Sequence, residues 1–477
     1  MTLPASWHGN WSGLSAVVLG LGKSGFSVAD TLIELGVKVT VIAKQFDPET
    51  LDLAELIGAT VLQGDEPELL DSLSTKPDFA VVSPGFKPSH PLVVALQTTG
   101  VELLSDIDLA WALRDKTPRI AKWLTITGTN GKTTTSELLA HMLRTGGFRA
   151  VACGNIGNPI LDMIRDPEGF DFLVVELSSF QLHYSHAVSA EASAFLNFAE
   201  DHLDWHGGVE EYFAAKAKIF SQSAAAIVFN EQDKRTFEAA QQAEVLEGAR
   251  GVSFTLGIPA RSMVGYVEEF LVDRAFLAER AEAALEIAET SDLEKIGEVT
   301  LQLRQNVAAA TALARAVDLP PVVIKHAIST FKLAPHRVQL VAERSGVRYI
   351  DDSKATNAHA AAGSLASFDS VVWIVGGLLK GVDISALIKS HAERLKSAVL
   401  IGADTSELER LFSELLPTLP LRVMTGKSMS QAVKVAAEMA TAGDTVLLAP
   451  AAASMDQYRD YVDRGEQFQA AVMGLSS

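Results

Sequence analysis

The stretch LTITGTNGKTTT, residues 124–135, joins an apolar run to two glycines, a lysine and several hydroxyl side chains. Its first half has the composition of a β-strand, and residues 136–143 carry apolar side chains at helical spacing. The glycines therefore fall at a strand-to-helix turn, where backbone N–H groups and the positive end of a helix attract phosphate. The pattern predicts a nucleotide site, with a plain glycine turn as the alternative.

The turn departs from the usual phosphate-loop pattern at one position. That pattern begins with a glycine where this chain has Ile126, so the match is to a shortened variant. Lys132 is expected to reach the outer phosphates, and Thr133 or Thr134 to hold Mg²⁺. We expect nucleotide contacts along the whole turn: Gly128, Thr129, Asn130, Gly131, Lys132, Thr133 and Thr134.

Length and composition limit the architecture and the ligands. A chain of 477 residues has room for roughly three domains, and 48% hydrophobic residues allow well-buried cores. The net charge of −19 argues against general binding of nucleic acid or anionic membranes, because both require a basic surface. Any anionic substrate must therefore meet local cations.

Cysteine content and hydropathy predict the compartment. The single cysteine, Cys153, excludes an intrachain disulfide framework and a cysteine-rich zinc site, which fits a reducing cytosol. We expect it to fill the core. The sequence has no run of eighteen apolar residues and no signal-peptide pattern at its start, so we expect a cytoplasmic protein without membrane insertion.

The first part of the chain predicts a small parallel sheet. Apolar strands are expected at 16–19, 37–42, 79–82 and 101–104, with helical stretches between them. The motif GLGKSG, residues 20–25, lies between the first strand and its helix. The acidic residue that an NAD site requires after the second strand is absent, since Ala43 and Lys44 stand there. The glycines therefore admit another nucleotide's diphosphate, or serve close packing of helix on strand.

Two further α/β regions follow. The second has strands at 172–176 and 192–196, and its segment from about 270 to 298 is rich in Ala and Glu and predicts a solvated helix. The third has strands at 347–350, 371–375, 399–401 and 445–448. We place the domain limits at 1–118, 119–333 and 334–477.

Polar residues after the strands of the second region are candidates for chemistry. Glu176 ends a strand and can help to hold the metal of a magnesium–nucleotide, or form a structural ion pair. His202 follows the next strand and offers an imidazole to a cation or substrate. Lys216 and Lys218 lie among apolar residues of a predicted helix, where surface lysines that extend to solvent are the alternative.

The third region concentrates charge after its first strand. Arg337 and Lys354 are suited to a transferring phosphoryl group or a carboxylate, and Asp352 to a ribose hydroxyl. The stretches at 376–381 and 450–458 also follow strands, so we expect them to line the same edge of the sheet.

Together these motifs make the chain resemble the Mur ligase family, ATP-dependent amide-forming enzymes of peptidoglycan synthesis. TGTNGKTT is general in that family and similar in folate-polyglutamate synthases. The remaining motifs are more selective: GLGKSG at 20–25, SPG at 83–85, ELSSFQL at 176–182, DDSKATN at 351–357 and ASMDQY at 453–458. The resemblance implies an α/β fold with a Rossmann-like N-terminal domain, a central P-loop ATPase-like parallel-sheet domain and a Rossmann-like C-terminal domain.

The resemblance also assigns tasks to individual residues. It implies that Gly22, Lys23, Ser24 and Ser83 bind the UDP moiety and that Asn155 contacts the muramoyl substrate. Lys132, Thr133, Asn306, Arg337 and Asp352 match contacts to ATP. Thr133, Glu176, His202 and Lys216 match the surroundings of two magnesium ions, with Lys216 carbamylated. Recognition of the amino acid falls to Lys354, Thr356, Lys380, Ser454, Met455 and Tyr461, and the catalytic group comprises Lys132, Lys216, His202, Arg337 and Lys354.

The reaction implied by the resemblance joins D-glutamate to UDP-N-acetylmuramoyl-L-alanine through an acyl phosphate. We expect the protein to be a monomer. The alternatives are a relative that adds another amino acid, such as L-lysine, and a UDP-sugar-binding protein without catalysis. Three positions depart from the family pattern. LRQNVAA at 303–309 keeps only the first asparagine of the nucleotide-contact motif, Ala43-Lys44 replaces a commoner acidic residue, and Tyr461 replaces a frequent phenylalanine.

Overall fold

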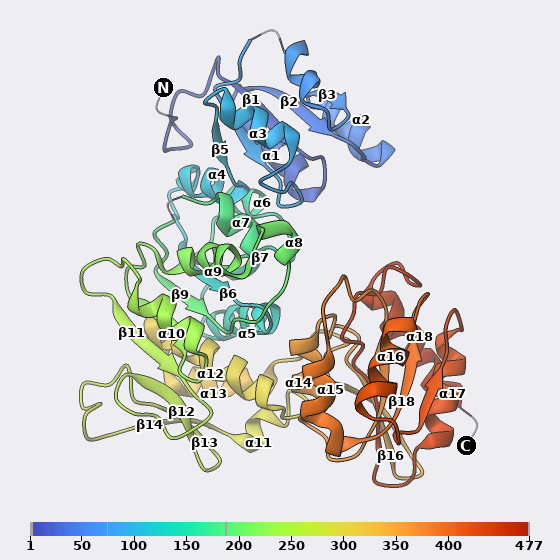
Figure 1. Cartoon of the computed structure of the whole chain (residues 1–477). Helices are drawn as coiled ribbons and strands as arrows, with labels where there is room; N and C mark the ends of the chain where they lie inside the picture. Colours follow the sequence, from blue (N-terminus) through green and yellow to red (C-terminus); the bar gives the residue numbers. More distant parts are fainter. Residues whose placement is uncertain (1–2, 74, 187, 476–477) are drawn as a thin grey trace. The chain divides into compact units, whose positions relative to one another are not determined.

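The computed structural model describes residues 3–73, 75–186 and 188–475, and its strands form three sheets, each accompanied by helices (Figure 1). The chain divides into two compact units, Met1–Ala288 with Asn306–Ala327, and Glu289–Gln305 with Ile328–Ser477. The first sheet and nearly all of the second belong to the first unit, and the third sheet belongs to the second unit. In the part of the chain described, no helix is both long and apolar enough to cross a bilayer.

The first sheet has five parallel strands in the order β3-β2-β1-β4-β5. Its strands agree with those predicted, apart from β3, which the sequence analysis did not assign. The elements are β1 (Ser15–Leu19), α1 (Lys23–Glu34), β2 (Lys38–Ala43), α2 (Pro48–Leu56), β3 (Thr60–Gln63), β4 (Phe79–Val82), α3 (Pro91–Thr98), β5 (Glu102–Leu104) and α4 (Asp106–Ala112).

The glycine motif at residues 20–25 brings helix α1 against the end of β1. Gly20 has a φ of +98°, and a Cβ built on Gly25 would lie 2.1 Å from the backbone oxygen of Gly20. No heavy atom lies within 4 Å of a Cβ built on Gly22. Close packing of helix on strand, one of the two predicted tasks, is therefore present at Gly25, whereas Gly22 stays open.

The second sheet has nine strands in the order β14-β13-β12-β11-β10-β9-β6-β8-β7. Its strands are parallel from β7 to β12, while β13 pairs antiparallel with β12. The predicted parallel sheet is thus extended at one edge by β13, which is antiparallel to its neighbour β12, and by β14. The strands are β6 (Lys122–Thr127), β7 (Ala150–Gly154), β8 (Phe172–Glu176), β9 (Ala192–Phe195), β10 (Ala226–Asn230), β11 (Arg250–Phe254), β12 (Met263–Val267), β13 (Phe270–Asp273) and β14 (Leu285–Glu289).

Strand β8, next to the edge strand β7, is buried along its whole length, as expected for a parallel strand covered on both faces. Cys153 is fully buried in β7, which confirms its predicted place in the core. The helices of this region are α5 (Lys132–Thr145), α6 (Ile160–Ile164), α7 (Ser179–Tyr184), α8 (Leu203–His206), α9 (Val209–Ala217), α10 (Lys234–Gln241), α11 (Thr290–Leu293), α12 (Leu301–Ala316) and α13 (Pro321–Thr330).

The helix predicted from about 270 to 298 is wrong. This segment contains β13, a turn region, β14 and the short helix α11. Strand β14 lies beside β13 at the edge of the sheet and buries Ile287 and Ala288. The Ala/Glu composition favours a helix locally, but hydrogen bonding to the edge of the sheet and burial of Ile287 and Ala288 outweigh that preference.

Polar contacts join the first sheet to the second within the first unit. Ser27 of α1 donates to Asp162 of α6 at 2.5 Å, and Arg165 forms ion pairs with Asp30 and Glu34 of α1. A single cluster of buried apolar side chains contains members from both sheets. These contacts fix the glycine motif of the first sheet relative to the second.

The third sheet has six strands in the order β15-β16-β20-β17-β18-β19. All neighbours are parallel except β15, which pairs antiparallel with β16. The elements are β15 (Gln339–Arg344), β16 (Val347–Asp351), α14 (Ala358–Leu365), β17 (Val371–Gly376), α15 (Ser385–His391), β18 (Leu395–Ile401), α16 (Ser406–Leu415), β19 (Leu421–Val423), α17 (Met429–Met439), β20 (Thr445–Leu448) and α18 (Tyr461–Met473).

The contact between Gly25 and Gly20 gives a stability test. We expect Gly25→Ala to lower the free energy of unfolding by about 1–3 kcal/mol, because the new methyl group has no space beside a backbone oxygen. Gly22→Ala is the matched control and should change it by about 0.5 kcal/mol or less. Urea unfolding followed by far-UV circular dichroism measures both. Equal effects of the two substitutions would contradict the close-packing role.

Candidate active site

The phosphate-loop turn has the geometry that its sequence predicts. Strand β6 ends at Thr127, helix α5 begins at Lys132, and Gly131 precedes it with a φ of +82°. The Nζ atom of Lys132 donates to the backbone oxygens of Gly128 at 2.8 Å and Thr129 at 3.0 Å. The lysine therefore lies over its own loop, at the amino end of α5 where phosphate is favoured.

Asn197, just beyond β9, holds this loop in shape. Its side-chain oxygen accepts the N–H of Asn130 at 2.9 Å, and its side-chain nitrogen donates to the Asn130 oxygen at 3.0 Å. The Asn197 backbone oxygen accepts the N–H of Thr129 at 3.0 Å. The sequence analysis missed Asn197, because its partners lie 67 residues away along the chain.

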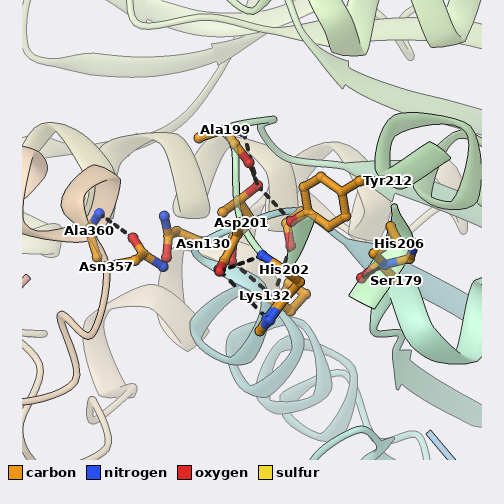
Figure 2. A network of polar contacts seen from close by, with 12 residues as sticks. Asn130, Lys132, Ser179, Ala199, Asp201, His202, His206, Tyr212, Asn357 and Ala360 are labelled. Atoms are coloured by element: carbon orange, nitrogen blue, oxygen red, sulfur yellow. Dashed lines mark hydrogen bonds and ion pairs between the residues drawn. The ribbon is translucent and has the colours of Figure 1, made fainter. Parts of the chain in front are cut away.

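The threonine of the loop ties it to the next segments. Thr129 Oγ1 donates to the Ala199 oxygen at 3.1 Å and accepts the Ala199 N–H at 3.0 Å. It also lies 3.2 Å from the hydroxyl of Tyr212 in α9 (Figure 2). A Cβ built on Gly131 would lie 2.3 Å from Oδ1 of Asn306, which places the predicted Asn306 directly against the loop.

Lys216 of α9 is buried beneath the same turn, not on the surface. Lys216 is only 2% exposed, and its Nζ donates to Gly128 O at 2.9 Å and Thr127 Oγ1 at 3.4 Å. Burial, and after it the charge of Lys132, lowers the pKa of Lys216 well below its ordinary value, although Asp201 and Glu176 act in the opposite direction. A neutral amine, the nucleophilic form, is therefore favoured here.

Glu176, at the end of β8, presents a buried oxygen that has no hydrogen-bond partner. Its Oε1 accepts from Nδ2 of Asn155 at 2.8 Å, whereas its Oε2 is buried and unpartnered. An unpaired carboxylate oxygen inside a protein is costly unless a cation or donor joins it. The residues present thus fit a magnesium ion, a hard cation that prefers oxygen ligands.

His202 lies at the start of α8 in a left-handed conformation, with a φ of +52°. Its Nε2 is 3.7 Å from Oδ2 of Asp201 (Figure 2). The His202 ring packs edge-to-face on Phe180. Across the described residues, no group of three His, Cys, Asp or Glu side chains forms a ready metal cage. Magnesium commonly uses one or two protein carboxylates and completes its shell with phosphate and water.

The predicted UDP residues lie at the carboxyl end of the first sheet. Lys23 and Gly22 are exposed and Ser24 is half-buried, at the beginning of α1. Ser83 follows β4, and its Oγ lies 3.0 Å from a Cβ built on Gly20. Lys44 forms an ion pair with Asp65 at 2.9 Å.

In the second unit, the loop after β16 is organised by a buried arginine. Arg464 of α18 is 1% exposed and donates to Ser353 Oγ at 3.0 Å, Ser353 O at 2.9 Å and Ala452 O at 3.1 Å. Arg464 therefore holds the stretch at 351–357 next to the stretch at 450–458. Burial lowers the pKa of Arg464 to about 10, so it stays charged at neutral pH.

Two aspartates after β16 differ in their partners. Asp351 is fully buried and its Oδ2 lies 2.7 Å from Nδ1 of His336, an ion pair that raises the pKa of His336. Asp352 accepts from Ser364 Oγ and from the Val338 N–H. Burial raises the pKa of Asp352 to about 6, against the opposing charge of Arg337.

The predicted amino-acid residues gather at the carboxyl edge of the third sheet. Lys354 Nζ lies 3.9 Å from the centre of the Tyr461 ring, a cation–π contact. A bridge between Leu378 and Ala453 joins the stretch that holds Lys380 to the one that holds Ser454 and Met455. Arg337 lines a cavity of about 760 Å³ together with residues 294, 296–299, 332–335 and 338–340.

Apart from the UDP residues on the first sheet, the structure brings the predicted residues together in two groups, one in each unit. The first unit gathers the phosphate loop with Asn155, Glu176, His202, Lys216 and Asn306, and the second gathers Arg337, Asp352, Lys354, Thr356, Lys380, Ser454, Met455 and Tyr461. The side chains that shape both groups, Asn197, Tyr212 and Arg464, were not predicted, because their contacts are long-range.

Comparisons with known proteins agree along the chain. Family models match residues 14–105 as "Mur ligase MurD-like, N-terminal domain", 126–287 as "Mur ligase middle domain" and 336–452 as "Mur ligase, glutamate ligase domain". UDP-N-acetylmuramoylalanine--D-glutamate ligase of Leifsonia xyli subsp. xyli is 50% identical, with 98% of this chain and 94% of that protein aligned. The protein of the same name from Tropheryma whipplei strain Twist is 43% identical, with 98% of each chain aligned.

Solved structures support the fold. MurF of Acinetobacter baumannii matches with a TM-score of 0.57 at 16% identity, over 98% of this chain and 92% of that one. UDP-N-acetylmuramate-alanine ligase MurC of Thermotoga maritima gives a TM-score of 0.55 at 16% identity, over 96% and 99%. The predicted three-part α/β fold is confirmed.

The unpartnered oxygen of Glu176 predicts an unusual substitution. We expect Glu176→Gln to raise the free energy of unfolding by about 1 kcal/mol, because it removes an uncompensated buried charge while the side-chain oxygen still accepts from Asn155. It should also abolish the extra rise in unfolding temperature that Mg²⁺ adds to a nucleoside triphosphate. Thermal unfolding with and without Mg²⁺ measures both effects.

Glu191→Gln is the control, because Glu191 is a partly exposed carboxylate that pairs with Lys122 at 2.9 Å. It should keep the magnesium effect and gain no stability. A destabilised Glu176→Gln protein that retains the magnesium effect would contradict the metal assignment.

Proposed function

This chain belongs to the Mur ligase family, and we propose that it joins D-glutamate to UDP-N-acetylmuramoyl-L-alanine, converting ATP to ADP and phosphate, in peptidoglycan precursor synthesis. The observation that carries the proposal is the 50% identity, over 98% of the chain, to a protein named UDP-N-acetylmuramoylalanine--D-glutamate ligase. The buried lysine and carboxylate beside the phosphate loop favour catalysis over simple binding of a UDP-sugar.

The reaction must bring two anions together. A substrate carboxylate oxygen attacks the γ-phosphorus of ATP, ADP leaves, and the amine of D-glutamate then displaces phosphate from the acyl phosphate. Lys132 and Arg337 are proposed to offset the repulsion between carboxylate and triphosphate. Glu176, His202, Thr133 and the modified Lys216 would hold two magnesium ions, which supply positive charge at the phosphate oxygens when bound.

Lys216 is proposed to act as a carbamate. Its depressed pKa favours the neutral amine, whose nitrogen attacks carbon dioxide and releases a proton to give an N-carboxylate. The product is an anion beside the ammonium group of Lys132, so the neighbouring pair attracts, whereas a protonated Lys216 would repel Lys132. Carbamylation therefore resolves the electrostatic conflict that the buried lysine creates.

Recognition of the amino acid is proposed for the second unit. The ammonium groups of Lys354 and Lys380 suit the two carboxylates of D-glutamate, while Thr356 and Ser454 add hydroxyl groups. Tyr461 supports Lys354 through the ring contact at 3.9 Å, and Met455 is 63% exposed beside Ser454. The loop clamp made by Arg464 keeps these segments in register.

The remaining substrate contacts are proposed for the first unit. Gly22, Lys23, Ser24 and Ser83 are proposed to bind the diphosphate of the UDP-sugar. Asn155, which donates to Glu176 at 2.8 Å, is proposed to contact the muramoyl group. Asn306 and Asp352 are proposed to contact ATP. The proposed domain limits are 1–118, 119–333 and 334–477. A cytoplasmic location is proposed, since ATP and a UDP-sugar are the substrates. The protein is also proposed to be a monomer.

The amino-acid specificity has a direct test. We expect phosphate release from Mg-ATP and UDP-N-acetylmuramoyl-L-alanine with D-glutamate, and background release with L-glutamate, L-lysine or no amino acid. Colorimetric phosphate detection, with mass spectrometry of the amide product, measures it. Release with another amino acid would preserve the ligase reaction but overturn the assignment of Lys354 and Lys380. Absence of release under every condition would favour a binding protein.

Carbamylation has its own spectroscopic test. In ¹³C-bicarbonate the protein should show one slowly exchanging carbamate carbon at neutral pH, absent from Lys216→Arg, because a permanently charged guanidinium cannot form it. Lys218→Arg, two residues along and half-exposed, is the control and should keep the signal. Lys216→Arg should lose activity by about 10²-fold or more. A carbamate signal that persists in Lys216→Arg would refute the assignment.

A further inference from the structure

Three arginines line a cavity of about 480 Å³ in the first unit, away from the phosphate loop. Arg250 begins β11, Arg261 lies in the loop between β11 and β12, and Arg280 lies in the turn region after β13. The ring of Phe276 forms part of the wall, with the Arg250 guanidinium 6.0 Å from its centre. Positive charge from three separate segments therefore converges on one concave surface.

The charges of these arginines are not neutralised by the protein. Within the described part of the chain, no carboxylate oxygen lies within 4.0 Å of Arg250, Arg261 or Arg280, whose recorded contacts are the Phe276 ring and a bond from Arg280 to Ala275 O at 3.4 Å. Five other arginines of the same unit are paired with carboxylates: Arg119, Arg149, Arg165, Arg235 and Arg315. Arg114, Arg144 and Arg274 instead donate to backbone oxygens, whereas Arg250, Arg261 and Arg280 turn toward one cavity in a chain of net charge −19.

The turn that carries Phe276 and Arg280 is held in place by buried and backbone contacts. Asp273 is fully buried and accepts the N–H groups of Ala275 at 2.7 Å and Phe276 at 3.0 Å. Arg274 donates to the backbone oxygens of Pro259, Arg280 and Ala281 at 3.3, 3.3 and 3.1 Å. The cavity wall is therefore preorganised, which lowers the entropic cost of binding a ligand.

The strand register places this cavity at the opposite edge of the sheet from the phosphate loop. Arg250 pairs with Ala226, Ala226 with Ala192, and Ala192 with Leu124, near the start of β6. The phosphate loop follows Thr127, at the other end of β6. Because these strands are parallel, their amino ends lie on one side of the sheet and their carboxyl ends on the other. The arginine cavity is therefore separate from the phosphate loop.

We propose that this arginine cavity binds the diphosphate or triphosphate group of a nucleotide, as a second anion site separate from the reaction. Guanidinium groups match phosphate oxygens in paired hydrogen bonds, and three of them balance most of a polyphosphate's charge. The Phe276 ring offers a face on which a base stacks. Inorganic diphosphate and free nucleotide share the phosphate chemistry, and the Phe276 contact distinguishes them.

Isothermal titration of the full-length protein with ADP and with inorganic diphosphate, without Mg²⁺, tests the proposal. With UDP-N-acetylmuramoyl-L-alanine present to fill the proposed UDP site, the wild type should bind two equivalents of each. Arg250→Gln combined with Arg261→Gln should weaken one class at least tenfold, leave kcat within twofold and leave the unfolding temperature unchanged. Arg410→Gln combined with Arg422→Gln makes the same charge change at exposed positions of the second unit and should keep both classes.

Phe276→Ala separates the two sources of phosphate. It should weaken the second class for ADP at least threefold and leave diphosphate unchanged, whereas an equal loss for both would overturn the base contact. A single equivalent in the wild type, or equal weakening in the two double variants, would overturn the anion site. If the Arg250/Arg261 variant unfolds early, Arg280→Gln provides the same titration test.

Discussion

Two lysines from different helices, Lys132 of α5 and Lys216 of α9, direct their Nζ atoms to one backbone oxygen, that of Gly128. Two ammonium groups on a single acceptor repel each other, and burial disfavours the charged form of Lys216. The position of Gly128, between the buried end of β6 and the start of α5, makes this contact possible. The chemistry proposed for the first unit follows from that shared oxygen: a cation for phosphate on one side and a reactive amine on the other.

Local sequence predicts much of the fold because its parallel strands are short, continuous apolar runs bounded by glycine or polar residues. Strands β4, β8 and β20 begin and end at the predicted residues. The segment from 270 to 298 shows the limit, since its alanines and glutamates favour a helix while the edge of a sheet recruits them as β14. A propensity that acts over a few residues cannot register a partner strand supplied by the rest of the fold.

The same distinction applies to the candidate site. Motifs marked Lys132, Glu176 and Lys354, because charged residues after strands are visible in the sequence. The surface interpretation left open for Lys216 was excluded only by its burial beneath the phosphate loop. Asn197 and Arg464 were not predicted, because what they hold together is separated by tens to more than a hundred residues. Contacting residues are recognisable from local pattern, whereas the residues that set their geometry are recognisable only in three dimensions.

The hydrogen bonds of Asn197 and Thr129 have a consequence for how the enzyme meets its nucleotide. The Asn197 side chain satisfies the backbone of Asn130 in the phosphate loop, and the Thr129 side chain ties the loop to the backbone of Ala199, so contacts within the protein hold the loop in shape. Conformational freedom that a flexible loop would lose on binding has already been lost during folding. The free energy of nucleotide contact is therefore not spent on ordering this loop, whose backbone already has its shape when the nucleotide arrives.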